Sequence, residues 1–240
     1  MLSRTYLYAR LGEMHGYVFA AGAAFFAQST MFEQPLKFLV VFFVVVEPIS
    51  LLPLFTGLTS GATPHYKRRM ALKAVIVAAA ILVLFAAGGA AFLELMGISL
   101  QAFRIFGGLL LFLLSLEMVF ARESGTRTSS DEAAENKRRA DISVFPLAFP
   151  FIAGPGALAT ILLWFGPVHM GTQPVLFGAY LAAVLVVLGI AFALMLLADP
   201  LMRVLGVTGA NVASRLLGVI LGALAVQFVL DGLRQAFGVG

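Results

Sequence analysis

A carboxylate and a hydroxyl stand beside two prolines in a long apolar stretch. Glu47, Pro48, Ser50 and Pro53 fall within the sequence Glu-Pro-Ile-Ser-Leu-Leu-Pro-Leu-Phe. Proline lacks a backbone N–H and disfavours helical angles in the residue before it, so a helix should break here and restart near Pro48 or Pro53. An acidic side chain inside a membrane is costly unless it is protonated, paired or hydrated. Glu47 should therefore face the protein interior, as a coupling group for a proton or cation, or structurally as an ion pair or helix cap.

A second apolar stretch repeats the pair of prolines about a hundred residues later. It contains Pro150, Gly154, Pro155 and Gly156 in the sequence Phe-Pro-Phe-Ile-Ala-Gly-Pro-Gly. The glycines allow close approach of a ligand to the backbone, and the first N–H groups of a restarted helix attract anions. These residues and the first group are the candidate substrate-binding residues. The alternative is a pair of proline kinks that only shape helix packing.

Two arginines precede apolar helices at matching places. Arg104 lies in Arg-Ile-Phe-Gly and Arg215 in Arg-Leu-Leu-Gly. Each could guide an anionic group toward a central site, act as a gate, or pair with Glu47. The simpler alternative is that both side chains extend to the membrane surface.

The composition is typical of an all-helical membrane protein. Of the 240 residues 61% are hydrophobic and 12% charged, and there is no cysteine. Apolar segments long enough to cross a bilayer predict six transmembrane helices. They cover about 36–58, 71–93, 100–121, 143–165, 175–198 and 212–237, and the fifth should stop at Asp199 and Pro200.

Most Lys and Arg residues fall in three loops that six crossings place on one side. These residues are Lys67, Arg68, Arg69, Lys73, Arg122, Arg127, Lys137, Arg138, Arg139 and Arg203. By the positive-inside rule this side is cytoplasmic, so both termini should be periplasmic. Residues 1–35 are expected to be an extension of uncertain structure; a signal peptide, or sequence upstream of a true start at Met31, are the alternatives.

The two halves resemble one another. Besides the proline pairs, the arginine motifs match, and each is followed by a polar residue, Glu117 or Gln227. Three helices make an odd number of crossings, so the halves should be inverted repeats. The expected division is a first repeat over 36–121, a cytoplasmic linker over 122–142 and a second repeat over 143–240. Inverted repeats with broken helices are typical of secondary transporters.

Several of these stretches together resemble the MarC family of bacterial integral membrane proteins. They are residues 47–55, 103–108, 146–157 and 214–228. The resemblance covers about 36–238 and implies a six-helix inner-membrane protein related to the superfamily of the LysE amino-acid exporters. The common form of the first motif is Asp-Pro-Ile-Gly-Asn, whereas Glu47, Ser50 and Leu51 stand here. A role of that asparagine amide is not carried over.

The leading hypothesis is therefore secondary transport or export of a small solute, an amino acid or an organic ion, through a site between the repeats. A membrane scaffold, a stress-associated interaction protein and a channel are the alternatives. Motifs for an enzyme, a cofactor, a metal site or nucleic-acid binding are missing from the sequence, so none of these is expected. The bilayer is the expected partner, and a homo-oligomer is left open.

Overall fold

The computed structural model describes residues 33–120, 141–168 and 170–238. The expected extension and the linker thus fall almost wholly outside the described residues. The chain forms two compact units, Met1–Lys37 and Phe38–Gly240. In the first, Lys37 pairs with Glu33 in the opening turns of a helix. The second unit holds all the candidate site residues and is described below.

Helices dominate this unit, and each expected membrane span coincides with a helix or a bent pair of helices. Among the described residues four helices are long and apolar enough to cross a membrane singly, and the number is up to six if each of two bent pairs forms one span. The single helices are α3 (Pro64–Leu95), α4 (Leu100–Phe120), α7 (Pro174–Leu196) and α8 (Ala198–Phe237). The bent pairs are Glu33–Val46 with α2 (Leu51–Leu58), and η1 (Ser143–Ile152) with α6 (Pro155–Phe165).

The first pair bends by 42° around Glu47. Glu47 takes a φ of 52°, in the left-handed region that non-glycine residues rarely enter. Its N–H still donates to the carbonyl of Phe43, and the N–H of Ser50 then turns back to the carbonyl of Glu47. The expected break is therefore confirmed, and Glu47 is its turning point.

The second pair bends by 55°, and its prolines act differently. Phe145 and Phe149, each before a proline, have extended backbones with φ near −130° (−129° and −131°), as the clash with the proline ring requires. The Phe145–Pro146 and Phe149–Pro150 peptide bonds are both cis. η1 uses wide turns, in which the N–H of Ala153 reaches back to Ala148.

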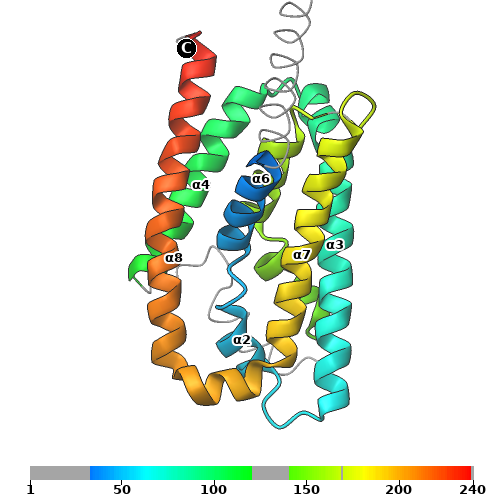
Figure 1. Cartoon of the computed structure of the whole chain (residues 1–240), viewed down its shortest axis with the longest axis vertical. Coiled ribbons are helices and arrows are strands. Elements are labelled where there is room, and N and C mark those ends of the chain that lie inside the picture. Colours follow the sequence, from blue (N-terminus) through cyan, green and yellow to red (C-terminus); the bar gives the residue numbers. More distant parts are fainter. Residues whose placement is uncertain (1–32, 121–140, 169, 239–240) are drawn as a thin grey trace, which may run out of the picture. The chain divides into compact units, whose positions relative to one another are not determined.

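α4 and α8 lie side by side and run in opposite directions (Figure 1). Glycines allow this approach, because a Cβ atom at Gly108 would be 2.8 Å from Val229 and one at Gly218 2.7 Å from Met118. Close packing through glycine is frequent between membrane helices. In addition, α3 packs against α7, α2 against α8, and α4 against α6.

Two element boundaries differ from the expected ones. α3 begins at Pro64 instead of near residue 71, because Thr63 caps it by accepting a hydrogen bond from the N–H of Tyr66. α7 ends at Leu196, just before the expected stop at Asp199 and Pro200. The sixth helix, α8, begins at Ala198 instead of near residue 212, so that Asp199 and Pro200 lie in its first turn, where an acidic residue and a proline are both favourable. Gly206, whose φ is 63°, interrupts α8.

An aromatic cluster holds the first helix against the second half. The ring of Phe38 lies 5.1 Å from that of Tyr180 on α7 and 5.5 Å from that of Trp164 on α6. Phe165 joins the group at 5.8 Å. Such tilted and edge-on contacts are the favourable geometries for aromatic pairs. The cluster therefore fixes the helix that leads into the first break.

Candidate functional site

A chain of three polar side chains crosses from the first break to α8. Glu47 is only 2% exposed. Its carboxylate accepts a hydrogen bond from the hydroxyl of Ser50. The oxygen of Ser50 lies 2.7 Å from that of Ser214 on α8. Because a serine hydroxyl has one hydrogen, Ser214 is the donor to Ser50 whenever Ser50 donates to Glu47.

Ser214 was not among the expected site residues. It lies 164 residues from Ser50 in the chain, and neither composition nor helical spacing links the two. The available signal was its place beside Arg215 in the repeated motif. In the structure it is Ser214 that contacts the break, whereas Arg215 is exposed on the surface of α8.

The other two residues of the first group shape the backbone. Pro48 is buried directly after Glu47, and Pro53 is half-buried as the third residue of α2. Ser50 occupies the N-cap position of α2, but its hydroxyl does not cap the helix. The expected burial of Glu47 in the protein interior is confirmed.

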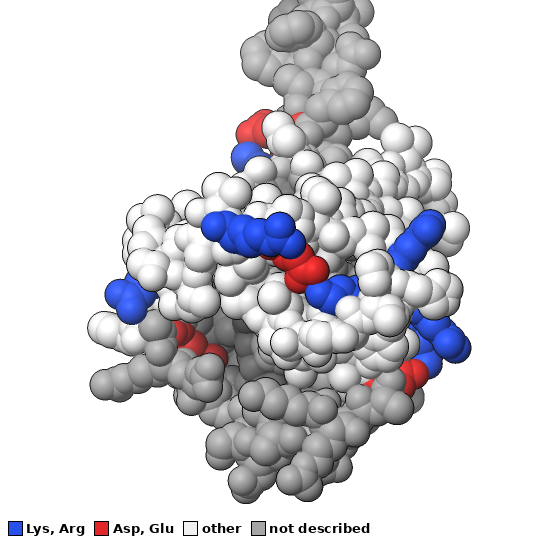
Figure 2. All heavy atoms as spheres, turned by 90° about the horizontal axis from the view of Figure 1, so that it is seen from below, with Lys and Arg blue, Asp and Glu red and all other residues white. Residues whose placement is uncertain are grey.

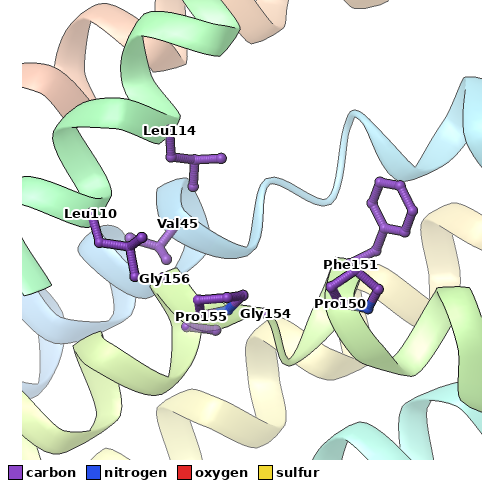
Figure 3. Close-up of a pocket in the computed structure, with 9 residues that line it drawn as sticks. Val45, Leu110, Leu114, Pro150, Phe151, Gly154, Pro155 and Gly156 are labelled. Atoms are coloured by element: carbon purple, nitrogen blue, oxygen red, sulfur yellow. The ribbon is translucent and has the colours of Figure 1, made fainter. Parts of the chain in front are cut away.

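The second group lines a small pocket (Figure 3). Its wall is formed by the end of the first helix, by α4 and by the second break. The lining residues are Val45, Leu110, Leu114, Pro150, Phe151, Gly154, Pro155, Gly156 and Ala157. The volume of about 30 Å³ leaves room for one or two water molecules. The wall is apolar apart from the backbone at the start of α6.

Backbone N–H groups at that start are the polar feature of the pocket. Pro155 is the first residue of α6, so Gly156 and Ala157 come next, where an N–H has no acceptor within the helix. Gly154, the N-cap, has no room for a side chain, because a Cβ atom would lie 2.2 Å from the carbonyl oxygen of Pro150. The tight turn thus requires glycine and presents free donors to the pocket.

The two breaks approach each other in the core. Val45 precedes Glu47 by two residues, and its side chain lies 3.4 Å from where a Cβ atom of Gly156 would stand. Leu111 and Leu114 of α4 contact the same glycine. The structure therefore brings the two groups close, but the pocket itself includes none of Glu47, Pro48, Ser50 and Pro53.

The two arginines differ in exposure. Arg104 is half-buried near the start of α4, and Arg215 is exposed on α8. Neither belongs to an ion pair within the described residues, so the expected pairing with Glu47 is not found there.

Charged side chains gather at the end where α3 and α8 begin (Figure 2). Lys67 of α3 pairs with Asp199 of α8 at 2.6 Å. Lys73 of α3 pairs with Asp141, just before η1. The hydrogen bond from Lys73, followed by those from Ser143, lowers the pKa of Asp141 to about 2. The three loops expected to hold most of the Lys and Arg residues therefore lie at the same end, as the sequence analysis predicted.

Comparison with known proteins identifies the family. The description "MarC family integral membrane protein" belongs to the family profile that matches residues 32–237. The UPF0056 membrane protein YhcE of Escherichia coli is 34% identical over 210 residues, covering 87% of this chain and 96% of the relative. A UPF0056 membrane protein of Aquifex aeolicus is 35% identical over 191 residues, covering 80% and 88%.

An archaeal relative, a UPF0056 membrane protein of Archaeoglobus fulgidus, is 35% identical over 203 residues, covering 80% of this chain and 89% of its own. Solved structures gave no match. The residues matched by the family profile include both breaks, both arginines and Ser214. The chain therefore belongs to the MarC family of integral membrane proteins.

Proposed function

We propose that this protein is a secondary transporter of the bacterial inner membrane that moves a small solute between two inverted three-helix repeats. The observation that carries the proposal is the approach of two broken helices at their breaks, through Val45 and Gly156. In secondary transporters, broken helices at a repeat interface supply the substrate and ion sites. By the positive-inside rule we expect the charged end seen in Figure 2 to be cytoplasmic and both termini to be periplasmic.

The directions of the helices support inversion. In the proposed repeat, α3 and α4 correspond to α7 and α8. Figure 1 shows α3 and α7 running in opposite directions, as do α4 and α8. The packing also fits the inversion, because α2 contacts α8, and α6, the counterpart of α2 in the second half, contacts α4. Each restarted helix therefore packs against the last helix of the other half.

Individual contacts between α4 and α8 also form pairs that the proposed repeat relates to each other. An alignment that sets Gly107 on Gly218 sets Gly108 on Val219 and Val229 on Met118. The contact of Gly108 with Val229 then has a counterpart in that of Gly218 with Met118, within one residue. This is the pattern expected of a two-fold axis that crosses the α4–α8 interface.

The two breaks suit different parts of the transport task. The free N–H groups of Gly156 and Ala157 suit an anionic group of the solute, such as the carboxylate of an amino acid or organic acid. Glu47 is the coupling group. A pocket of about 30 Å³ is far below the roughly 300 Å³ or more of a typical ligand pocket. We therefore assign this conformation to a closed state of the transport cycle.

Flux measurements test the proposal. Purified protein in proteoliposomes is assayed for uptake and efflux of amino acids and organic ions, with Glu47→Gln beside the wild type. We expect saturable flux of at least one solute class, reduced at least tenfold in the variant. Flux in the wild type that persists unchanged in Glu47→Gln removes Glu47 from the mechanism. Linear, non-saturating flux indicates a channel, and no flux across the panel favours a scaffold.

A further inference from the structure

The kink at Gly206 divides α8 into two helices. All 40 residues as one straight helix would be about 60 Å long, roughly twice the thickness of the hydrocarbon layer of a membrane. Gly206 has a φ of 63°, a conformation that favours glycine. Figure 1 shows the first turns of α8 lying across the end of the bundle, whereas the rest of the helix runs alongside α4. We call residues 198–205, which precede the kink, the end segment.

One side of the end segment is held to the protein. Ala198 is 1% exposed, and Leu201 and Met202 are half-buried against the core. At the polar edge of the segment, Asp199 pairs with Lys67 of α3 at 2.6 Å. The segment is therefore fixed at the level of the charged residues with which α3 begins.

A second edge of the end segment exposes apolar groups. Pro200 and Val204, four residues apart, share a face of the helix, and both are exposed. Val204 is 87% exposed, more than any other large apolar side chain among the described residues. Leu197, just after α7, and Val207, just after the kink, flank the segment and are also exposed. Because these residues continue the exposed apolar surface of α7, a candidate membrane span, the lipid around α7 is the medium that reaches them.

Arg203 adds positive charge beside the apolar edge. It is exposed and forms no ion pair within the part of the chain that the structure describes. The carboxylates of Asp199 and Asp141, at the same end of the protein, pair with lysines of α3 instead. A guanidinium binds a phosphate through two parallel hydrogen bonds. Helices that lie in a membrane surface combine exposed apolar side chains with such cations.

We infer that the end segment lies in the headgroup layer of the membrane as an in-plane anchor, with Val204 inserted between lipids and Arg203 bound to the phosphate of an anionic phospholipid. Gly206 is the corner between a helix in the membrane surface and a helix that spans the membrane. The ion pair of Asp199 with Lys67 ties the anchor to α3. This inference concerns the lipid partner and does not depend on transport.

The fluorescence of a single tryptophan measures how deep the end segment lies. Trp164 is the only tryptophan of the chain, so Trp164→Phe provides a background without one. In that background Val204→Trp is compared with Leu185→Trp, at an exposed position within α7, and with Ser60→Trp, in the exposed turn after α2. The full chain is reconstituted into vesicles of phosphatidylcholine and phosphatidylglycerol, with bromine on the acyl chains either near the headgroup or near the chain end.

We expect bromine near the headgroup to quench Val204→Trp at least about twofold more than bromine near the chain end, because an interfacial helix buries its apolar side chains only shallowly. The order should be reversed for Leu185→Trp. Ser60→Trp should be quenched little by either lipid.

A second comparison tests the role of Arg203. The same bromine label is placed on phosphatidylglycerol or on phosphatidylcholine, at equal mole fractions. We expect labelled phosphatidylglycerol to quench Val204→Trp about twofold more, because the guanidinium enriches anionic lipid beside it. Arg203→Gln should remove this preference, and Arg203→Lys should retain most of it. Arg234→Gln, in the last turn of α8 and far from the end segment, is the matched control and should leave the preference unchanged.

Three results would overturn the anchor. Quenching of Val204→Trp as weak as that of Ser60→Trp would place the segment in water or under protein, such as a second copy of the chain. Quenching strongest near the chain end would place it inside a span. Equal quenching by the two labelled lipids would refute recognition of an anionic headgroup. Should Val204→Trp fail to fold, a nitroxide on Val204→Cys reports the same depth through its relative accessibility to O₂ and to a water-soluble nickel complex, because the chain has no cysteine of its own.

Discussion

In the first break a buried carboxylate meets two serine hydroxyls, whereas the second break carries Phe149 where the first has Glu47. Ile152 stands where the first break has Ser50, and the proposed repeat aligns Phe103 with Ser214. The proline spacing is shared, but polar side chains fill one break and apolar ones the other. The second break obtains its polarity from backbone N–H groups at the start of α6.

Under the proposed repeat, the two breaks share a plan of the backbone while their side-chain chemistry differs. In α2 the N–H of Leu52 already donates to Ile49, and Pro53 has none to offer. The first break therefore presents mainly oxygen atoms, whereas the second break presents N–H groups. Under the proposed transport function the two breaks would serve different groups, the coupling ion and the solute.

Gly154→Ala should have the largest effect, because it tests whether the second break depends on its tight turn. The new Cβ atom would lie 2.2 Å from the carbonyl oxygen of Pro150, so the turn must shift. We expect a loss of about 3 kcal/mol in unfolding free energy, or no folded protein. Gly178→Ala on α7 is the control, since no atom lies within 4 Å of its Cβ position. Equal thermal stability of the two variants would contradict the tight turn.

Ser50→Ala tests the polar chain of the first break. It removes the hydroxyl that donates to the buried Glu47, and we expect a loss of about 1–3 kcal/mol in unfolding free energy. Ser115→Ala, which removes a hydrogen bond within one helix, should cost less than about 1 kcal/mol. A double-mutant cycle of Ser50 with Ser214 should show coupling of about 0.5–1.5 kcal/mol. Additive effects would show that the two hydroxyls do not interact.

Asp141→Asn tests the ion pair that ties η1 to α3. The pKa of Asp141 in the folded protein is about 2, below the usual value near 3.9. Its contribution to stability is therefore complete above the usual value and is lost as the pH falls through about 2. Solvent screens this exposed pair, so we expect a loss of about 0.2–1 kcal/mol at pH 7. The difference in Tm between variant and wild type should shrink toward zero at pH 2, and a constant difference would contradict the assignment.

Trp164→Phe should have the smallest effect. The indole Nε1 is buried and has no hydrogen-bond partner among the described residues, so the substitution removes no such bond. The ring contact with Tyr180, at 5.7 Å, can be kept by phenylalanine. We expect a change within about 1 kcal/mol, against about 3–5 kcal/mol for Trp164→Ala. A large loss in Trp164→Phe would reveal an indole contact that the structure does not contain.

The sequence was sufficient to predict the helices and both breaks, because each depends on local features. The length of each apolar segment defines a span, and the prolines within it define the interruption, because proline has no N–H to donate and disfavours helical angles in the residue before it. The same local rules missed the start of α3, where Thr63 and Pro64 begin the helix before its apolar part. Ser214 could not be predicted, since its contact with Ser50 depends on how α8 packs against α2. The half-burial of Arg104 and the exposure of Arg215 depend on helix rotation, which motif spacing does not determine.

The dependence of solute uptake on an ion gradient, with Na⁺ and H⁺ tried separately, tests most directly whether Glu47 at the first break is the coupling group of the proposed transporter. Initial rates in proteoliposomes are compared with and without the gradient for the wild type, Glu47→Gln and Phe149→Leu, which alters the equivalent position of the second break. We predict that the gradient stimulates uptake in the wild type and in Phe149→Leu but not in Glu47→Gln. Equal stimulation in all three proteins, or its loss in both variants, would contradict a division of roles between the two breaks.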